Sequence, residues 1–193
     1  MSGFHARTHL RAVLHVALVT LALLLVPLVA MHFTDQVRWN AMDFIVAGVL
    51  MFTAGFSFAQ VLRSTRRPAL RLAFGLALAG AFLLVWANLA VGMAGPPGNP
   101  ANVMYAGVLV VGLAGTLVAR LNPRGMALAM LATALALVLA AVLALSAFSG
   151  TASAQPDVIL VTHGFFAGLF LVSAWLFRRG ARATGAPQAD DMP

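Results

Sequence analysis

The sequence predicts an all-α, polytopic membrane protein, a bundle of six transmembrane helices with both termini in the cytoplasm. The first reason is composition, because 62% of the residues are hydrophobic, only 9% are charged and the mean hydropathy is +0.95. A soluble domain could not bury so much apolar surface around one core. The second reason is that the arginines fall almost entirely on alternate connections between apolar runs.

Six apolar runs are long enough to cross the hydrocarbon core of a bilayer as helices. Residues 1–179 therefore form the predicted transmembrane domain. The polar remainder, residues 180–193, is rich in Ala, Gly and Pro and is expected to be a disordered cytoplasmic tail. The six runs cover residues 11–31, 41–62, 70–93, 103–119, 125–148 and 158–177, with boundaries defined to within a few residues.

The first run also has features of a signal peptide, because a basic start precedes an apolar stretch that ends in Leu28, Val29 and Ala30. Its apolar length of about 19 residues exceeds that of the usual signal-peptide core, so a retained helix is the preferred interpretation. Cleavage would leave the topology of the remaining helices unchanged. The chain has no cysteine, which excludes disulfide and thiolate chemistry.

Lys and Arg together number 12, all of them arginines, and only Arg38 lies in the connections on the outer side of the predicted bundle. Basic residues stay preferentially on the cytoplasmic side, so this split predicts that both termini lie in the cytoplasm. We expect the net charge of +7 to face the lipid bilayer and its anionic headgroups rather than nucleic acid. The inner-side arginines are Arg7, Arg11, Arg63, Arg66, Arg67, Arg71, Arg120, Arg124, Arg178, Arg179 and Arg182.

Polar residues of the apolar runs gather at one depth, in the periplasmic half and on the side of Arg38 and Trp39. An ionisable residue inside a membrane is costly and by default marks a functional site. This polar layer is therefore a candidate ligand, ion or proton site. The alternative is a structural role, as helix caps, interfacial aromatic residues and a hydrogen-bonded histidine. Its members are Asp43, Asn88, Asn102, Tyr105 and His163.

Nothing in the layer has the signature of a particular cofactor, and neither a cofactor nor a metal is predicted. A b-type haem needs two axial ligands at compatible depth, whereas His15 and His163 fall near opposite faces. A metal held by His32, Asp43 and His163 would rest on no diagnostic spacing. Because the chain contains no lysine, a Schiff base to retinal is excluded.

An intramembrane enzyme is the least favoured class. The six runs, Arg38-Trp39 and His163-Gly164 resemble parts of a rhomboid protease. Ala114 stands where the rhomboid GxSG pattern needs its serine, so His163 has no nucleophile to activate.

Pairs of small residues predict where helices approach closely, because helix packing in lipid depends on small side chains. The clearest pair is Gly164 and Gly168, in GxxxG spacing within the last apolar run. The other pairs are Gly48 and Gly55, Gly75 and Ala79, and Gly112 and Gly115.

Three stretches resemble a family of small, uncharacterised bacterial integral membrane proteins. They begin at His32, Asn88 and Arg124, cover most of residues 25–145, and contain the patterns Trp-x-x-x-Asp-Phe and Asn-Pro-Ala-Asn. The resemblance implies six helices and no established activity. Acidic residues are common in the family near position 59 and just before Asn-Pro-Ala-Asn. The residues there in this chain are Ala59, Pro97 and Gly98, which weakens any carboxylate-dependent role.

Three functional classes follow. A non-enzymatic membrane protein, free-standing or an accessory subunit of a membrane complex, requires only the small-residue faces and the arginine-rich connections. A small carrier or ligand-binding protein would use the polar layer, although the inner half offers only Thr53, Ser57 and Gln60 as matching polar groups. An enzyme would depend on Asp43 and His163. The first class is the preferred interpretation.

Overall fold

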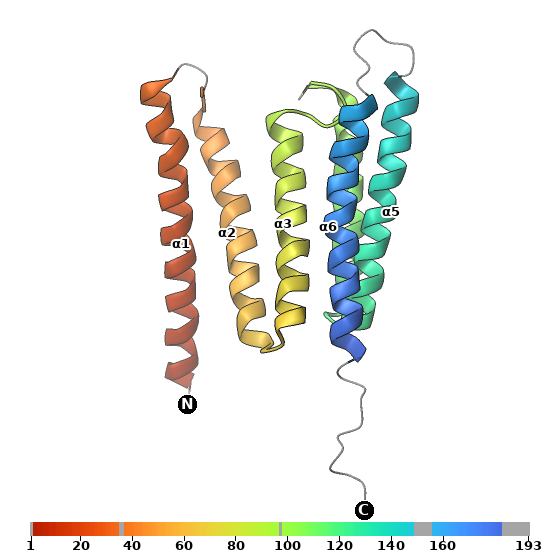
Figure 1. The fold of residues 1–193 in the computed structure, drawn as a ribbon. Coiled ribbons are helices and arrows are strands. Elements are labelled where there is room, and N and C mark those ends of the chain that lie inside the picture. The colour runs from red at the N-terminus through yellow and green to blue at the C-terminus, as the bar shows by residue number, and fades with distance from the viewer. Residues whose placement is uncertain (1, 35–36, 97, 149–155, 183–193) are drawn as a thin grey trace, which may run out of the picture. The chain divides into compact units, whose positions relative to one another are not determined.

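The computed structural model describes residues 2–34, 37–96, 98–148 and 156–182, and the regular secondary structure within these ranges is helical. Six of the helices are long and apolar enough to cross a membrane, which confirms the all-α prediction and supports a multi-pass membrane protein. The elements are α1 (Ser2–Phe33), α2 (Ala41–Ser64), α3 (Pro68–Ala90), the short 3-10 helix η1 (Pro100–Val103), α4 (Met104–Ala119), α5 (Pro123–Phe148) and α6 (Pro156–Arg182) (Figure 1).

α1 and α6 extend furthest beyond the apolar runs that predict them. α1 begins at Ser2, before its apolar run, and no proline interrupts the residues between. α6 ends at Arg182, although a disordered tail is expected from residue 180. The last turn of α6 is held by α3, because Gly180 and Ala181 are buried and Arg67 Nη1 donates a hydrogen bond to the Gly180 carbonyl at 3.4 Å. Residues 183–193 of the predicted tail lie outside the described part.

The helices form two compact units, residues Met1–Ser64 and Thr65–Pro193, called here the α1–α2 unit and the α3–α6 unit. In the α1–α2 unit, Gly48 and Gly55 of α2 face α1. A Cβ on these glycines would lie 3.3 Å from Leu24 Cδ1 and 3.1 Å from Val16 Cγ1. The predicted packing role of this glycine pair is therefore confirmed. Packing of all six helices into one bundle stays a prediction.

In the α3–α6 unit, α6 contacts both α3 and α5, and α5 contacts α4 (Figure 1). The core combines small side chains of α3 and α5 with aromatic side chains of α6. Phe177 packs edge-on against Phe74 with ring centroids 4.7 Å apart. The buried Ser173 hydroxyl donates to the Ala73 carbonyl at 2.8 Å, which links α6 to the backbone of α3. A polar contact thus supplements the apolar packing of these two helices.

The contacts that an added Cβ would make at each glycine show which of the predicted small-residue pairs lie between helices. A Cβ at Gly115 would lie 3.1 Å from the backbone Cα of Ala129, and one at Gly112 would lie 3.0 Å from Thr133 Oγ1, so this pair does pack α4 on α5. A Cβ at Gly164 or Gly168 would meet no described atom within 4 Å. The GxxxG face of α6 is therefore not a packing face among the described residues, contrary to the prediction.

The α3 pair also differs from expectation. Ala79 is exposed, and the close contact of α3 is made by Gly80, whose added Cβ would lie 3.2 Å from Phe170 Cζ. The neighbouring small side chains Ala73 and Ala77 are buried. Spacing predicts that small residues cluster on α3, but the position of Phe170 determines that Gly80 is the residue in close contact.

Candidate functional site

Asp43 lies at the start of α2 and takes part in a reciprocal helix cap. Its Oδ2 accepts a hydrogen bond from the Asn40 backbone N–H at 2.8 Å, while Asn40 Oδ1 accepts from the N–H groups of Met42 at 2.8 Å and Asp43 at 3.2 Å. This is a capping box, which satisfies backbone donors that a helix start leaves unpaired. The structural interpretation of Asp43, as the complement of a helix N-terminus, accounts for its position.

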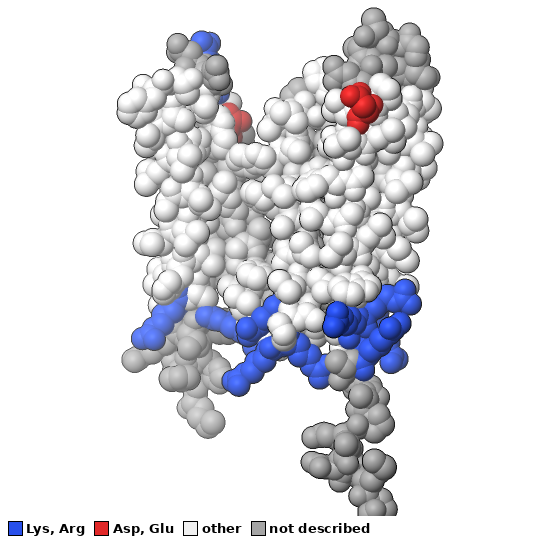
Figure 2. Space-filling view, in the orientation of Figure 1, with Lys and Arg blue, Asp and Glu red and all other residues white. Residues whose placement is uncertain are grey.

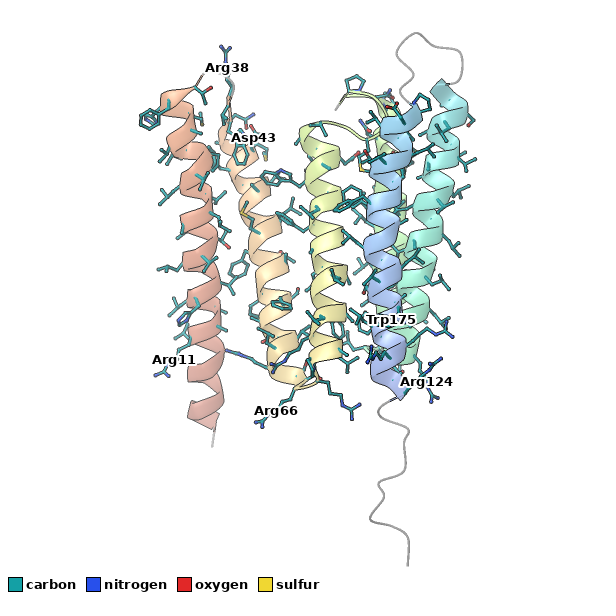
Figure 3. All side chains as sticks on the ribbon, in the orientation of Figure 1. Arg11, Arg38, Asp43, Arg66, Arg124 and Trp175 are labelled. Carbon is teal, nitrogen blue, oxygen red and sulfur yellow. The ribbon has the colours of Figure 1, made fainter. Side chains whose placement is uncertain are left out.

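The same segment contains a second helix-start feature. Trp39, which precedes the cap residue Asn40, packs edge-on against Phe44 with centroids 5.2 Å apart. A contact between the residue before the cap and the fourth helical residue is a hydrophobic staple, and it fixes the direction in which the chain enters the helix. The whole Trp-x-x-x-Asp-Phe pattern is thus explained by the start of α2, whose Asp43 is labelled in Figure 3.

Asn102 organises the connection between α3 and α4. Its Oδ1 accepts hydrogen bonds from the backbone N–H groups of Met93 at 3.1 Å and Ala94 at 2.9 Å, and its Nδ2 donates to the Pro96 carbonyl at 2.8 Å. The side chain is 5% exposed. Asn102 therefore satisfies three backbone groups that this buried segment would otherwise leave unpaired.

Asn102 precedes the fourth apolar run and is therefore a candidate cap for α4, but it does not cap this helix. The preceding asparagine supplies the cap, because Asn99 Oδ1 accepts from the Ala101 N–H at 2.9 Å at the start of η1. The Asn102 side chain binds the loop that follows α3 instead, in which Gly92 and Gly95 have positive φ angles of 73° and 83°. These turns bring Met93 and Ala94 back toward η1, a path that glycine allows at little cost.

Tyr105 and His163 form a buried hydrogen-bonded pair between α4 and α6. Tyr105 is 1% exposed and His163 is 2% exposed, and the Tyr105 hydroxyl lies 2.8 Å from His163 Nε2. His163 Nδ1 lies 2.7 Å from the Ile159 carbonyl, which can only accept, so Nδ1 carries a proton and donates. In neutral histidine, Nε2 is then an acceptor for the Tyr105 hydroxyl. Both ring nitrogens are satisfied within the protein, and the ring faces protein.

Asn88 is the one polar residue of the layer with an unsatisfied atom. Its Nδ2 donates to the Asn102 carbonyl at 3.4 Å, a long contact that joins the end of α3 to η1. Its Oδ1 is buried and has no hydrogen-bond partner among the described residues. A buried acceptor without a partner is unusual and is the feature of this layer most consistent with a missing donor, such as a water molecule or a ligand.

The structure brings four of the five predicted residues together in pairs. Asn88 contacts Asn102, and Tyr105 contacts His163, all within the α3–α6 unit. Asp43 belongs to the α1–α2 unit. No three His, Cys, Asp or Glu side chains in the described ranges are grouped so that they could hold a metal ion.

The predicted headgroup arginines of the α3–α6 unit differ in their contacts. Arg67 and Arg71 bind backbone carbonyls, of Gly180 and of Thr65 at 2.8 Å, and so hold the start of α3. Arg179 instead lies 5.4 Å from the ring centroid of Trp175, a cation–π contact on the exposed side of α6. This contact spans four residues of one helix, so helical spacing alone could have indicated it.

Comparison with protein-family models, with curated proteins and with solved structures finds no match to this chain.

Proposed function

We propose that this protein is a non-enzymatic, multi-pass protein of the bacterial cytoplasmic membrane, with both termini in the cytoplasm, acting alone or as an accessory subunit of a membrane complex. The observation that carries this proposal is the Tyr105–His163 pair. Its hydrogen bonds engage both ring nitrogens of His163 with protein groups, so the imidazole serves to join α4 to α6.

The remaining polar residues support the same interpretation. Asp43 and Asn99 cap helix starts, and Asn102 holds the connection between α3 and α4. General acid–base catalysis needs a group that can exchange a proton with a substrate within hydrogen-bond reach. His163 can do so only by giving up one of its two hydrogen bonds to the protein.

The bacterial inner-membrane location and the topology are supported by the arginine split and by the resemblance to small bacterial membrane proteins. The six apolar helices supply the crossings, and the connections rich in arginine alternate with connections that contain only Arg38. We also propose that the chain belongs to this family of small bacterial integral membrane proteins.

A small carrier or a ligand-binding protein is the second candidate, and the buried Oδ1 of Asn88 is the observation that favours it. The ligand would donate a hydrogen bond to Asn88 and would lie next to the Asn102 backbone. The first candidate accounts for more of the layer, because this acceptor alone lacks a partner among the buried polar side-chain atoms of the described residues.

Native mass spectrometry of the full chain, extracted in polymer-bounded membrane discs, tests the proposal. The expected result is the chain alone or with another membrane subunit, with no bound small molecule other than lipid. The Asn88→Leu variant, which removes the unpaired acceptor, should give the same spectrum. A non-lipid molecule that binds the wild-type chain and is lost from Asn88→Leu would contradict the first candidate and favour the second.

A further inference from the structure

The connection between α4 and α5 contains two consecutive residues in the left-handed backbone region. Arg120 has φ 47° and ψ 40°, and Leu121 has φ 60°. The turn is tight: the Arg120 N–H reaches the Leu117 carbonyl at 3.2 Å, and the Asn122 N–H reaches the Ala119 carbonyl at 2.8 Å. Glycine is the residue that helices normally place at such an end, because its backbone adopts this conformation without a steric penalty. Arg120 therefore occupies this position at a conformational cost that glycine would not have.

The arginines of the α3–α6 unit fall into two groups by their contacts. Arg67 and Arg71 donate to backbone carbonyls and are part of the fold. The others are exposed and make no side-chain hydrogen bond or ion pair with any residue of the described part, apart from the ring contact of Arg179 with Trp175. This second group, called here the exposed-arginine surface, comprises Arg66, Arg120, Arg124, Arg178, Arg179 and Arg182.

The α3–α6 unit offers this surface no nearby counter-charge among its own described residues. The described carboxylate of the α3–α6 unit is Asp157, in the first turn of α6, whereas Arg178 lies near the other end of the same helix. The 21 helical steps from Asp157 to Arg178 span roughly 32 Å, several times the screening length of about 8 Å at physiological salt. Figure 2 shows Lys and Arg side chains, in blue, gathered at one end of this unit.

The apolar surroundings indicate which anion neutralises these charges. Next to Arg120, the side chains of Leu117, Val118 and Leu121 are 68%, 84% and 60% exposed, so the charged group adjoins an uncovered apolar surface. Trp175, beside Arg179, is an amphipathic ring of the kind found at the level of lipid headgroups. Acyl chains would cover the leucines and the valine while phosphates reach the guanidinium groups. A nucleic acid or a soluble acidic protein would leave these apolar side chains in water.

We propose that the exposed-arginine surface binds the phosphate groups of anionic phospholipids, with Arg120 and Arg124 as a pair of ligands across the α4–α5 turn. The planar guanidinium forms two parallel hydrogen bonds to a phosphate, which suits a binding role better than a diffuse charge does. This inference rests on the membrane insertion in the proposed function, and it is independent of which side of the membrane the surface faces.

Native mass spectrometry of the detergent-purified full chain, titrated with phosphatidylglycerol or phosphatidylcholine, tests the inference. We expect the wild-type chain to bind phosphatidylglycerol more tightly. Arg120→Gly should reduce that affinity about fivefold, and adding Arg124→Gln should reduce it roughly twenty-five-fold if the two effects add. Arg120→Gly also relieves the left-handed strain, so its thermal stability should match or exceed that of the wild type. Loss of binding in this variant therefore cannot be attributed to misfolding.

Arg38→Gln is the matched control, because it removes one arginine from the α1–α2 connection, outside the exposed-arginine surface. It should leave the affinity for phosphatidylglycerol unchanged. Equal affinity of the wild type for both lipids would overturn the inference, as would an Arg120→Gly variant with undiminished affinity. A loss in Arg38→Gln as large as that in Arg120→Gly would assign the effect to net charge alone and would also overturn it. None of these outcomes bears on whether the chain spans a membrane.

Discussion

Polar residues that look functional in the sequence have local partners in the structure. His163 has one partner nearby in the sequence and one far away: the Ile159 carbonyl is one helical turn away, whereas Tyr105 is 58 residues away. The first partner follows from helical spacing. The second depends on how α4 and α6 pack, which hydropathy does not specify. Depth along each helix could therefore predict that these residues lie at a common level, but not that they bind one another.

A double-mutant cycle of Tyr105→Phe and His163→Leu measures the strength of this pair. Tyr105→Phe keeps the ring and leaves the buried Nε2 without a donor, so it should destabilise the protein. We expect a coupling free energy of about 0.6 kcal/mol, and not more than about 1.7 kcal/mol, the range found for hydrogen bonds between helices in a membrane. The measurement is reversible unfolding in mixed micelles. Additive single effects would show that the hydrogen bond contributes nothing to stability.

Asn102 should matter more than Asn99, although the two stand in one motif. Asn102→Leu leaves two backbone N–H groups and one carbonyl unpaired at a buried position, and it should cost more than about 2 kcal/mol. Asn99→Ala removes one cap and should cost about 1 kcal/mol. Denaturation of both variants in the same detergent compares them. The reverse order of stabilities would argue against the assigned roles.

At the level of helices, small residues matter only where a neighbouring backbone or side chain approaches. The GxxxG spacing of Gly164 and Gly168 is the clearest packing signal in the sequence, yet both glycines face open space. Gly112 and Gly115 have a less familiar spacing and make the tight contacts with α5. The difference arises because α6 presents Phe166, Phe170 and Phe177 to the core instead. These aromatic side chains supply the apolar contact area, and they rotate the glycine face away from the core.

Alanine substitutions at two glycines test this distinction. At Gly115 the new Cβ would lie 2.8 Å from the Ala129 Cβ and 3.1 Å from its Cα, so α4 must move away from α5. We expect Gly115→Ala to lower stability by about 1–3 kcal/mol, the usual cost of overpacking. Gly164→Ala is the matched control and should be neutral or slightly stabilising, because its methyl group meets open space. Thermal unfolding of the purified variants measures both, and equal destabilisation would contradict the packing described.

For the whole molecule, composition and hydropathy predicted more than any motif did. Hydropathy located all six long helices, because a helix that spans a bilayer must be apolar over most of its length. The ends were less predictable: α6 continues to Arg182 because α3 contacts Gly180, and no local pattern encodes that contact. The loop that Asn102 holds was not predictable from hydropathy either, because its path depends on the positive φ angles of Gly92 and Gly95.

Reporter fusions at two sites test the central claim, a six-crossing membrane protein with both termini in the cytoplasm. Gly98 suits an insertion because its surroundings are open, and the second fusion follows Arg182, since Gly180 is buried against Leu70. We expect alkaline phosphatase to be active at Gly98 and inactive after Arg182, and green fluorescent protein to give the opposite pattern, because eleven of the twelve arginines lie in the termini and connections predicted to be cytoplasmic. The same compartment at both sites, or a periplasmic signal after Arg182, would contradict the account.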